Sequence, residues 1–258
     1  MTQPLASIHP DAKIHPSVVI EPFVTIHGNV EIGEGSHIYS NATIMDGARI
    51  GKNVKIFPGA VVSGPPQDLK FRGEDTVAII GDGTTLRECV TIHRGTASKG
   101  KTVVGSNSLI MAYCHVAHDC VVGNNVIMSN AVQMAGEVVV DDFAVLGGGA
   151  LIHQFCHIGS HVMLQGGALV NKDIPPFVKA ARDPIAYVGV NSIGLRRRGF
   201  TNEAIRDIQE IYRYLYLSGL NVTDAINRIE AELPASKERD EIILFVRNSG
   251  RGILRGYV

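Results

Sequence analysis

The fold is decided by a six-residue pattern that is clearest at residues 8–44, which read IHPDAK IHPSVV IEPFVT IHGNVE IGEGSH IYSNAT I. Each unit opens on an aliphatic residue. Outward from this stretch, steps of six from Ile8 to Val170 visit 28 positions, and 25 of them hold Ile, Val, Leu or Met. The exceptions are Asp68, Glu74 and Ser98. A helix would repeat apolar residues about every 3.6 positions and a half-buried strand about every second one, so the pattern fits neither.

The remaining positions of the unit predict a turn. A small or β-branched residue stands four after the aliphatic one, as at Ala12 and Val18, and Gly, Asn or Asp often precedes it, as at Asp11, Asn29 and Gly35. Gly, Asn and Asp tolerate a positive φ. A strand and a turn in every unit predict a solenoid in which three units close a coil of about 18 residues, with coils about 4.8 Å apart. We therefore predict a mainly β protein, a parallel β-helix.

Two stretches interrupt the repeat, at about residues 63–79 and 97–103. Both are polar and contain Gly or Pro, so we expect external loops on the column. Loops on a rigid scaffold often carry binding residues, although a tolerated insertion would look the same. We assign residues 1–190 to the β-helix with these two loops.

Helical patterning replaces the six-residue period in the C-terminal part of the chain. Residues 191–258 predict one helix capped by Thr201 and ending at Gly219, a second after a cap at Thr223, and a third at about residues 237–248. A solenoid needs its ends covered, so we expect an α-helical C-terminal domain that caps the column.

Composition narrows the class of function. The 24 basic and 25 acidic residues nearly cancel, which argues against a nucleic-acid partner. No apolar run approaches the roughly 18 residues of a membrane span, and we expect a cytoplasmic protein without membrane insertion. The four cysteines indicate reduced thiols. Cys114, Cys120 and Cys156 occupy the small inward position, which argues against cysteine nucleophiles, and Cys89 falls at a corner.

The stretch MAYCHVAHD at residues 111–119 contains the first candidate for catalysis. His118 does not point inward, so it can act as a general base, and Asp119 can fix its tautomer. Asp119 also occupies the turn position, and a purely structural role stays open. One coil on from His118 lies Gly136, whose backbone N–H can hold an oxyanion unless this glycine only serves its turn. Two coils on lies Gln154.

The hexapeptide pattern resembles that of a large group of acyltransferases that form left-handed β-helices. The hand is implied by this resemblance alone, since the general crossover rule favours the opposite hand. The fold also resembles the gamma-class carbonic anhydrases, which hold zinc with three histidines. Counting back two coils from His118 and His115 gives Asp82 and Ile79, so that ligand pattern is missing. We expect no metal and no cofactor.

Six motifs resemble the UDP-N-acetylglucosamine acyltransferase family, over essentially the whole chain. They read QDLKF at 67–71, TIHRGT at 91–96, HVAHDCVVGN at 115–124, VDDFAVLGG at 140–148, HQFCHIG at 153–159 and RRRGF at 196–200. The resemblance implies a homotrimer that moves a 3-hydroxyacyl group from acyl carrier protein to the 3-hydroxyl of UDP-N-acetylglucosamine, the first step of lipid A synthesis. It implies direct transfer without a covalent acyl-enzyme.

The same resemblance implies roles for individual residues. His118 would act as general base, Asp119 would orient its ring, and the N–H of Gly136 would hold the oxyanion. Gly166, with Met163 nearby, would measure the acyl chain, and a glycine there implies a long 3-hydroxyacyl donor. Contacts with the sugar, the nucleotide and the carrier are implied for Gln67, Asp68, Lys70, His93, His115, His153, Gln154, Asn191, Arg197 and Arg198.

Three departures from the family pattern leave the fine substrate preference open, including a 3-amino in place of a 3-hydroxyl acceptor. Glu137 stands where family members carry a histidine, Ile193 where they often carry a glutamate, and Arg182 with Asp183 replaces a Gly-Asn pair. A related transferase that acylates the amine of an acylated sugar nucleotide carries an extra N-terminal domain. A purely structural solenoid would show outward threonine ladders instead of the QDLKF loop.

Overall fold

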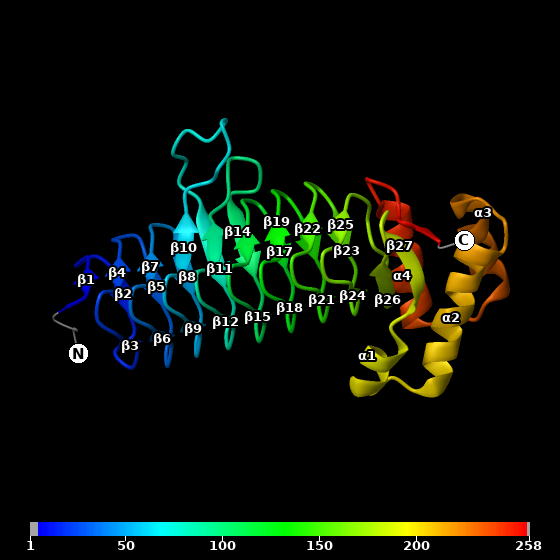
Figure 1. Ribbon diagram of the computed structural model, residues 1–258, viewed down its shortest axis with the longest axis horizontal. Helices are drawn as coiled ribbons and strands as arrows, with labels where there is room; N and C mark the ends of the chain where they lie inside the picture. Colours follow the sequence, from blue (N-terminus) through cyan, green and yellow to red (C-terminus); the bar gives the residue numbers. More distant parts are fainter. Residues whose placement is uncertain (1–4, 257–258) are drawn as a thin grey trace.

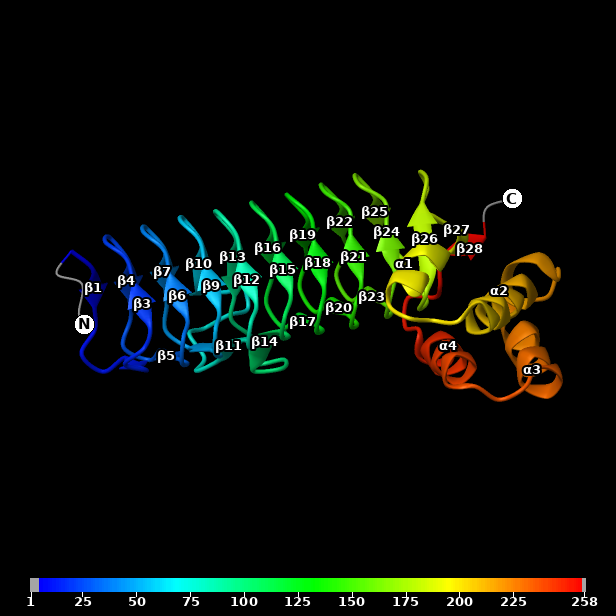
Figure 2. The ribbon, with the colours of Figure 1, turned by 90° about the horizontal axis from the view of Figure 1, so that it is seen from below.

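Most strands in this protein pair from coil to coil and not with their neighbours in sequence. In the computed structural model, which describes residues 5–256, Ser7 pairs with Thr25 and Ile8 with Ile26, an offset of 18 residues. Repetition of this parallel pairing gives three sheets that form the sides of a three-sided column (Figures 1 and 2). The predicted fold class, a mainly β protein with a parallel β-helix followed by α-helices, is confirmed.

Each side of the column is one sheet. Sheet A contains β1 (Ser7–Ile8), β4 (Thr25–Ile26), β7 (Thr43–Ile44), β10 (Val61–Gly64), β13 (Thr91–His93), β16 (His115–Val116), β19 (Gln133–Met134), β22 (Leu151–Ile152) and β25 (Leu169–Val170). Sheet B contains β2 (Lys13–Ile14), β5 (Glu31–Ile32), β8 (Ala48–Ile50), β11 (Val77–Ile80), β14 (Lys101–Val104), β17 (Val121–Val122), β20 (Val139–Val140) and β23 (His157–Ile158). Sheet C contains β3 (Val19–Ile20), β6 (His37–Ile38), β9 (Lys55–Ile56), β12 (Thr85–Leu86), β15 (Leu109–Ile110), β18 (Ile127–Met128), β21 (Val145–Leu146), β24 (Met163–Leu164), β26 (Val178–Ala181), β27 (Ala186–Val190) and β28 (Arg255–Gly256).

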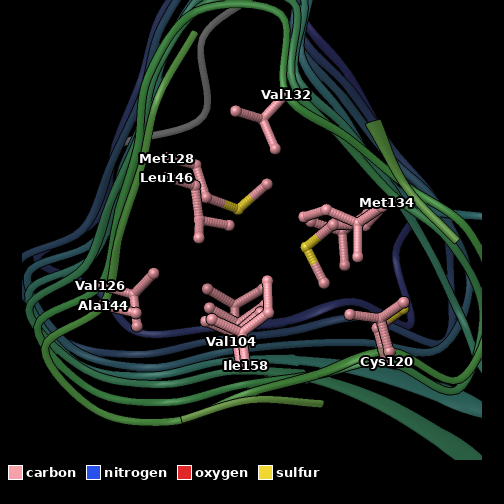
Figure 3. Close-up of a cluster of buried hydrophobic side chains, with 14 of the residues drawn as sticks. Val104, Cys120, Val126, Met128, Val132, Met134, Ala144, Leu146 and Ile158 are labelled. Atoms are coloured by element: carbon pink, nitrogen blue, oxygen red, sulfur yellow. The ribbon is translucent and has the colours of Figure 1, made fainter. Parts of the chain in front are cut away.

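The core is the stack of inward side chains along the column axis. Figure 3 shows Met134 on the sheet A side, Met128 on the sheet C side and Val104 on the sheet B side, and these residues are buried. Smaller residues fill the corners, with Cys120 at the corner between sheets A and B and Ala144 at the corner between sheets B and C. Large side chains on the flat sides and small ones at the corners fill a triangular cross-section.

Residues 77–79 and 101–103 were predicted as loop but pair with each other in β11 and β14. Two shorter segments leave the column near the expected breaks. They connect β10 to β11 and β13 to β14, and Figure 1 shows both projecting from the same side of the column. We call residues 65–76 the first loop and residues 94–100 the second loop. The guanidinium of Arg94 lies 5.4 Å from the ring centroid of Phe71, and its Nη1 donates to the carbonyl of Asp46 at 3.1 Å. Arg94 thus ties the first loop to the column.

The C-terminal part closes the open end of the column. The hairpin of β26 and β27 extends sheet C, and β28 pairs with β27 after the helices α1 (Ser192–Arg197), α2 (Asn202–Leu217), α3 (Val222–Glu232) and α4 (Lys237–Asn248). The short helix α1 and the strand β28 were not predicted. In the described part of the chain, no helix is long and apolar enough to cross a membrane.

One predicted helix start is wrong. Thr223 was expected to cap the second long helix, but the cap of α3 is Asn221, whose side chain accepts from the N–H of Asp224 at 2.9 Å. Asn221 has an extended backbone, which suits a cap, whereas Thr223 lies inside the first helical turn. Thr201 caps α2 as predicted.

Candidate active site

A pocket of about 590 Å³ opens on the outward face of sheet A. Two ladders of residues, each stepping by 18 from coil to coil, form most of its wall, since equivalent positions of successive coils stack. The first ladder is His115, Gln133, Leu151 and Leu169, and the second is Ala117, Ala135, His153 and Asn171. His93, His118, Gly136, Gln154 and, from the first loop, Gln67 also line the pocket. The pocket therefore combines an apolar wall with several imidazoles.

His118 and Asp119 lie at the corner between sheets A and B. The His118 side chain is only 11% exposed, and its Nδ1 lies 2.8 Å from Oδ2 of Asp119, which is fully buried. A carboxylate only accepts, so Nδ1 carries the proton and donates it. Nε2, on the other side of the ring, is left as the acceptor. This is the arrangement that a general base requires.

The Asp119 carboxylate is held by the second loop. It accepts from the backbone N–H of Thr96 at 2.9 Å, from the Thr96 hydroxyl at 2.6 Å and from the N–H of Lys99 at 3.2 Å. Burial opposes the charged form, but the hydrogen bonds from Thr96 and His118 outweigh it and lower the pKa of Asp119. Asp119 has a φ of 60°, so it serves as a corner residue. The same residue also contacts His118.

Gly136 lies one coil beyond His118, against the face of its ring. A Cβ on Gly136 would lie 2.6 Å from Cε1 and 2.7 Å from Nε2 of His118, so only glycine fits there without moving the ring. Among residues 5–256 no protein group accepts a hydrogen bond from the Gly136 N–H. An unpaired N–H beside a basic nitrogen is suited to hold a developing oxyanion.

Two further histidines form one wall of the pocket as neutral rings. The rings of His93 and His115 meet edge to face at 4.7 Å, and Nδ1 of His115 lies 2.7 Å from the Thr91 hydroxyl. Burial lowers the pKa of His93 to about 4, and burial also lowers the pKa of His115. Both rings therefore stay uncharged near neutral pH, and they offer hydrogen bonds without adding positive charge near His118.

Three of the four cysteines are unsuited to nucleophilic catalysis, as the sequence indicated. Cys114, Cys120 and Cys156 are buried inside the column. Burial raises the pKa of these thiols to about 11, 12 and 11, respectively. The reactive form of cysteine is the thiolate, which is negligible at such values. In the described residues, no group of three or more His, Cys, Asp or Glu is placed to hold a metal ion.

Several residues that the resemblance implicated lie outside this pocket. Asp68 and Lys70 are on the first loop beyond Gln67, where Oδ1 of Asp68 accepts from the N–H of Lys70 at 2.9 Å and closes a turn. Met163 is 40% exposed on β24 of sheet C. Gly166 is at the following corner, where a Cβ would lie 3.1 Å from the carbonyl oxygen of Gly148.

The candidate phosphate-binding residues lie on another edge of the column. Asn191 caps α1 and donates from Nδ2 to the carbonyl of His161 at 2.9 Å. Arg198 stacks over Phe143 at 4.5 Å from the ring centroid, and Arg197 beside it is exposed. Phe143 precedes Ala144, so it belongs to the corner between sheets B and C, whereas Asp119 precedes Cys120 at the other end of sheet B (Figure 3). Within one copy of the chain, Arg198 and His118 therefore lie at different corners of the column.

Sequence reasoning missed the residues that support the base and line the apolar wall. Thr96 belongs to a motif quoted for its resemblance, but no contact with Asp119 was expected. The wall residues Gln133, Leu151 and Leu169 carried a usable signal, because each follows His115 by a multiple of 18 positions. The hydrogen bonds from the second loop to Asp119 carried no such signal, because an inserted segment does not follow the six-residue repeat.

Comparisons with known proteins give matches over most of this chain. The family described as Udp N-acetylglucosamine O-acyltransferase, Domain 2 matches residues 173–254, and the bacterial transferase hexapeptide family matches residues 101–136. An acyl-[acyl-carrier-protein]–UDP-N-acetylglucosamine O-acyltransferase of Burkholderia orbicola is 45% identical over 201 residues, which are 76% of this chain and 77% of that protein.

Solved structures extend the similarity to nearly the full length. A UDP-N-acetylglucosamine acyltransferase of Bacteroides fragilis is 55% identical with a TM-score of 0.97, over 99% of this chain and 100% of that one. The enzyme of Francisella novicida is 40% identical with a TM-score of 0.96, over 99% of this chain and 94% of that one. This chain belongs to the UDP-N-acetylglucosamine O-acyltransferase family.

Proposed function

We propose that this protein transfers a long 3-hydroxyacyl group from acyl carrier protein to the 3-hydroxyl of UDP-N-acetylglucosamine, in the cytoplasm, as the first step of lipid A synthesis. The observation that supports it most directly is the contact of His118 with Asp119 on one side and Gly136 on the other. A base and an oxyanion donor side by side are what acyl transfer to a hydroxyl needs. The names of the relatives supply the substrates.

The chemistry is a direct displacement at the thioester. Nε2 of His118 takes the proton of the sugar 3-hydroxyl as its oxygen attacks the thioester carbonyl carbon. The N–H of Gly136 donates to the carbonyl oxygen as it gains negative charge. The attack gives a tetrahedral intermediate. When this intermediate collapses, the C–S bond breaks and the carrier thiolate takes the proton from His118. Asp119 stabilises the imidazolium between these steps.

The other implicated residues bind substrate in this proposal. Gln67, His93, His115, His153 and Gln154 line the pocket where sugar and thioester meet. Asp68 and Lys70 contact the sugar from the first loop, and Asn191, Arg197 and Arg198 bind the UDP phosphates, a task that suits the forked guanidinium. Residues 1–190 carry the chemistry, and residues 191–258 close the column.

We also propose a homotrimer in which neighbouring copies share each site. Within one copy, Arg198 and His118 lie on different edges of the column. Large apolar side chains remain exposed around the pocket, with Leu151 48%, Leu169 55% and Phe155 53% exposed. A closed ring of identical copies would cover them and bring Arg198 of one copy to His118 of the next.

The first test is acyl transfer by the purified protein with UDP-N-acetylglucosamine and a series of 3-hydroxyacyl carrier proteins. His118→Ala should lower kcat by about 10²- to 10⁴-fold, because the hydroxyl loses its base. His15→Ala is the control, since His15 is exposed on an early coil and its side chain contacts Ser17. A wild-type protein without turnover would contradict the function, and a near-normal His118→Ala would remove only the proposed base.

Gly136→Ala should reduce kcat by about 10²-fold or more, because its methyl group pushes the imidazole from its position and crowds the oxyanion. The Cβ clash of 2.6 Å with His118 is the physical reason. Gly250→Ala is the matched control, because a Cβ on Gly250 meets no atom within 4 Å. If both variants kept wild-type kcat, Gly136 would have no part in the site.

Gly166→Met should shift the preferred donor to a shorter 3-hydroxyacyl chain, because the added side chain would occupy space that we propose the end of a long acyl chain fills. Competition between carrier proteins with different chain lengths measures this as a ratio of kcat/KM values. Gly250→Met should leave the ratio unchanged. An unchanged ratio in Gly166→Met would show that the chain is measured elsewhere.

Shared sites predict complementation between inactive variants. His118→Ala and Arg198→Ala subunits, unfolded together and refolded into mixed trimers, should regain activity, because some sites combine an intact His118 from one copy with an intact Arg198 from the next. Light scattering during size-exclusion chromatography checks the trimer. Mixed trimers without regained activity would place both residues of a site in the same copy.

A further inference from the structure

The second loop makes a side-chain contact with the coil beyond the catalytic corner. Nζ of Lys99 lies 3.5 Å from Oε2 of Glu137, and the Ser98 hydroxyl donates to Oε1 of Glu137 at 3.1 Å. The backbone N–H of Glu137 donates to the carbonyl of His118 at 3.0 Å. One short loop therefore contacts both the residue after the candidate oxyanion donor and, through Thr96, the carboxylate behind the base.

This ion pair is more shielded from water than the lysine–glutamate pairs Lys13–Glu31 and Lys52–Glu34 of the column. The side chains of Lys99 and Glu137 are 37% and 20% exposed. A lysine–glutamate pair that joins adjacent coils, Lys52 and Glu34 at 3.4 Å, is 60% and 57% exposed. Charges that are partly removed from water interact more strongly than fully solvated ones, so the Lys99–Glu137 pair has more influence on its surroundings.

The position of Glu137 creates an electrostatic problem for acyl transfer. Its carboxylate follows Gly136 directly, so alone it would oppose the negative charge that develops on the thioester oxygen. It would also favour the protonated form of the nearby imidazole, which cannot act as a base. The Lys99 ammonium cancels that charge, and it lies 3.4 Å from the carbonyl oxygen of Asp119 as well.

We propose that Lys99 and Glu137 form a positioning pair that closes the second loop over Asp119 and keeps the surroundings of His118 and Gly136 electrically balanced. This inference rests on the proposed acyl transfer. It gives a role to Glu137 and to Lys99. Neither side chain is proposed to touch substrate, so both act through Asp119, His118 and Gly136.

The test compares Lys99→Met, Glu137→Gln and the double variant by their kcat, KM and pH profiles. Lys99→Met should lower kcat by about tenfold with little change in KM for either substrate, because it disturbs the base and not binding. The acid limb of its kcat/KM profile should move to higher pH, since the uncompensated carboxylate favours protonated imidazole. Adding Glu137→Gln should return that limb toward wild type, and Lys99→Arg should restore kcat.

Two controls separate this role from general stability. Lys52→Met breaks the more exposed pair between coils and should leave kcat and the pH profile unchanged. Cleavage by trypsin after Lys99, within the second loop, should accelerate in Glu137→Gln but not in Glu34→Gln, because only the former releases the loop. This readout needs no activity.

The outcomes are distinct for the two proposals. Wild-type protein that turns over the substrates, with a Lys99→Met variant of unchanged kcat and unchanged acid limb, would overturn the positioning pair and leave the acyl transfer standing. A pH shift that persists in the double variant would also overturn it, because the shift would not come from Glu137. A wild-type protein without turnover would contradict the proposed function itself, whatever the trypsin result.

Discussion

The stacking of inward aliphatic side chains at a fixed spacing is the constraint on which the rest of this structure depends. Ile26, Ile44, Val62 and Ile92 follow one another in sheet A, and all are buried. A slip of one residue would turn these side chains to solvent, so the register of every coil is strongly specified. The same register fixes what points outward. His115 in β16 pairs with Gln133 in β19 because the aliphatic residues beside them are stacked.

Register also explains why the proposed base and oxyanion donor are neighbours. His118 and Gly136 occupy equivalent positions of successive coils, and strand pairing separates such positions by about 4.8 Å. Two groups at this spacing can act on an attacking hydroxyl and on the carbonyl that it attacks without a conformational change. The corner geometry contributes as well, since a residue with positive φ, such as Asp119, bends the chain and still presents a side chain to the histidine.

The sequence predicted those parts of the molecule that obey the repeat. Steps of 18 placed Gly136 and Gln154 beside His118, and all of them line the pocket. Prediction failed where the repeat stops. Lys99 and Glu137 are 38 residues apart, which is no multiple of the coil, so nothing in the pattern joins them. The cap at Asn221 was missed because Asn and Thr are both good caps, and only the backbone conformation distinguishes them.

The division between column and loops also separates two physical tasks. The column holds groups that must not move relative to one another, and their spacing is inherited from a core that no substrate touches. The second loop adds the polar contacts that a column of stacked aliphatic residues cannot supply, namely several hydrogen bonds to one buried carboxylate. Because Asp119 is fully buried, losing these bonds would leave a charge without partners, which is far more costly than losing a surface contact. The insertion that interrupts the repeat is therefore what makes a charged residue tolerable at this corner.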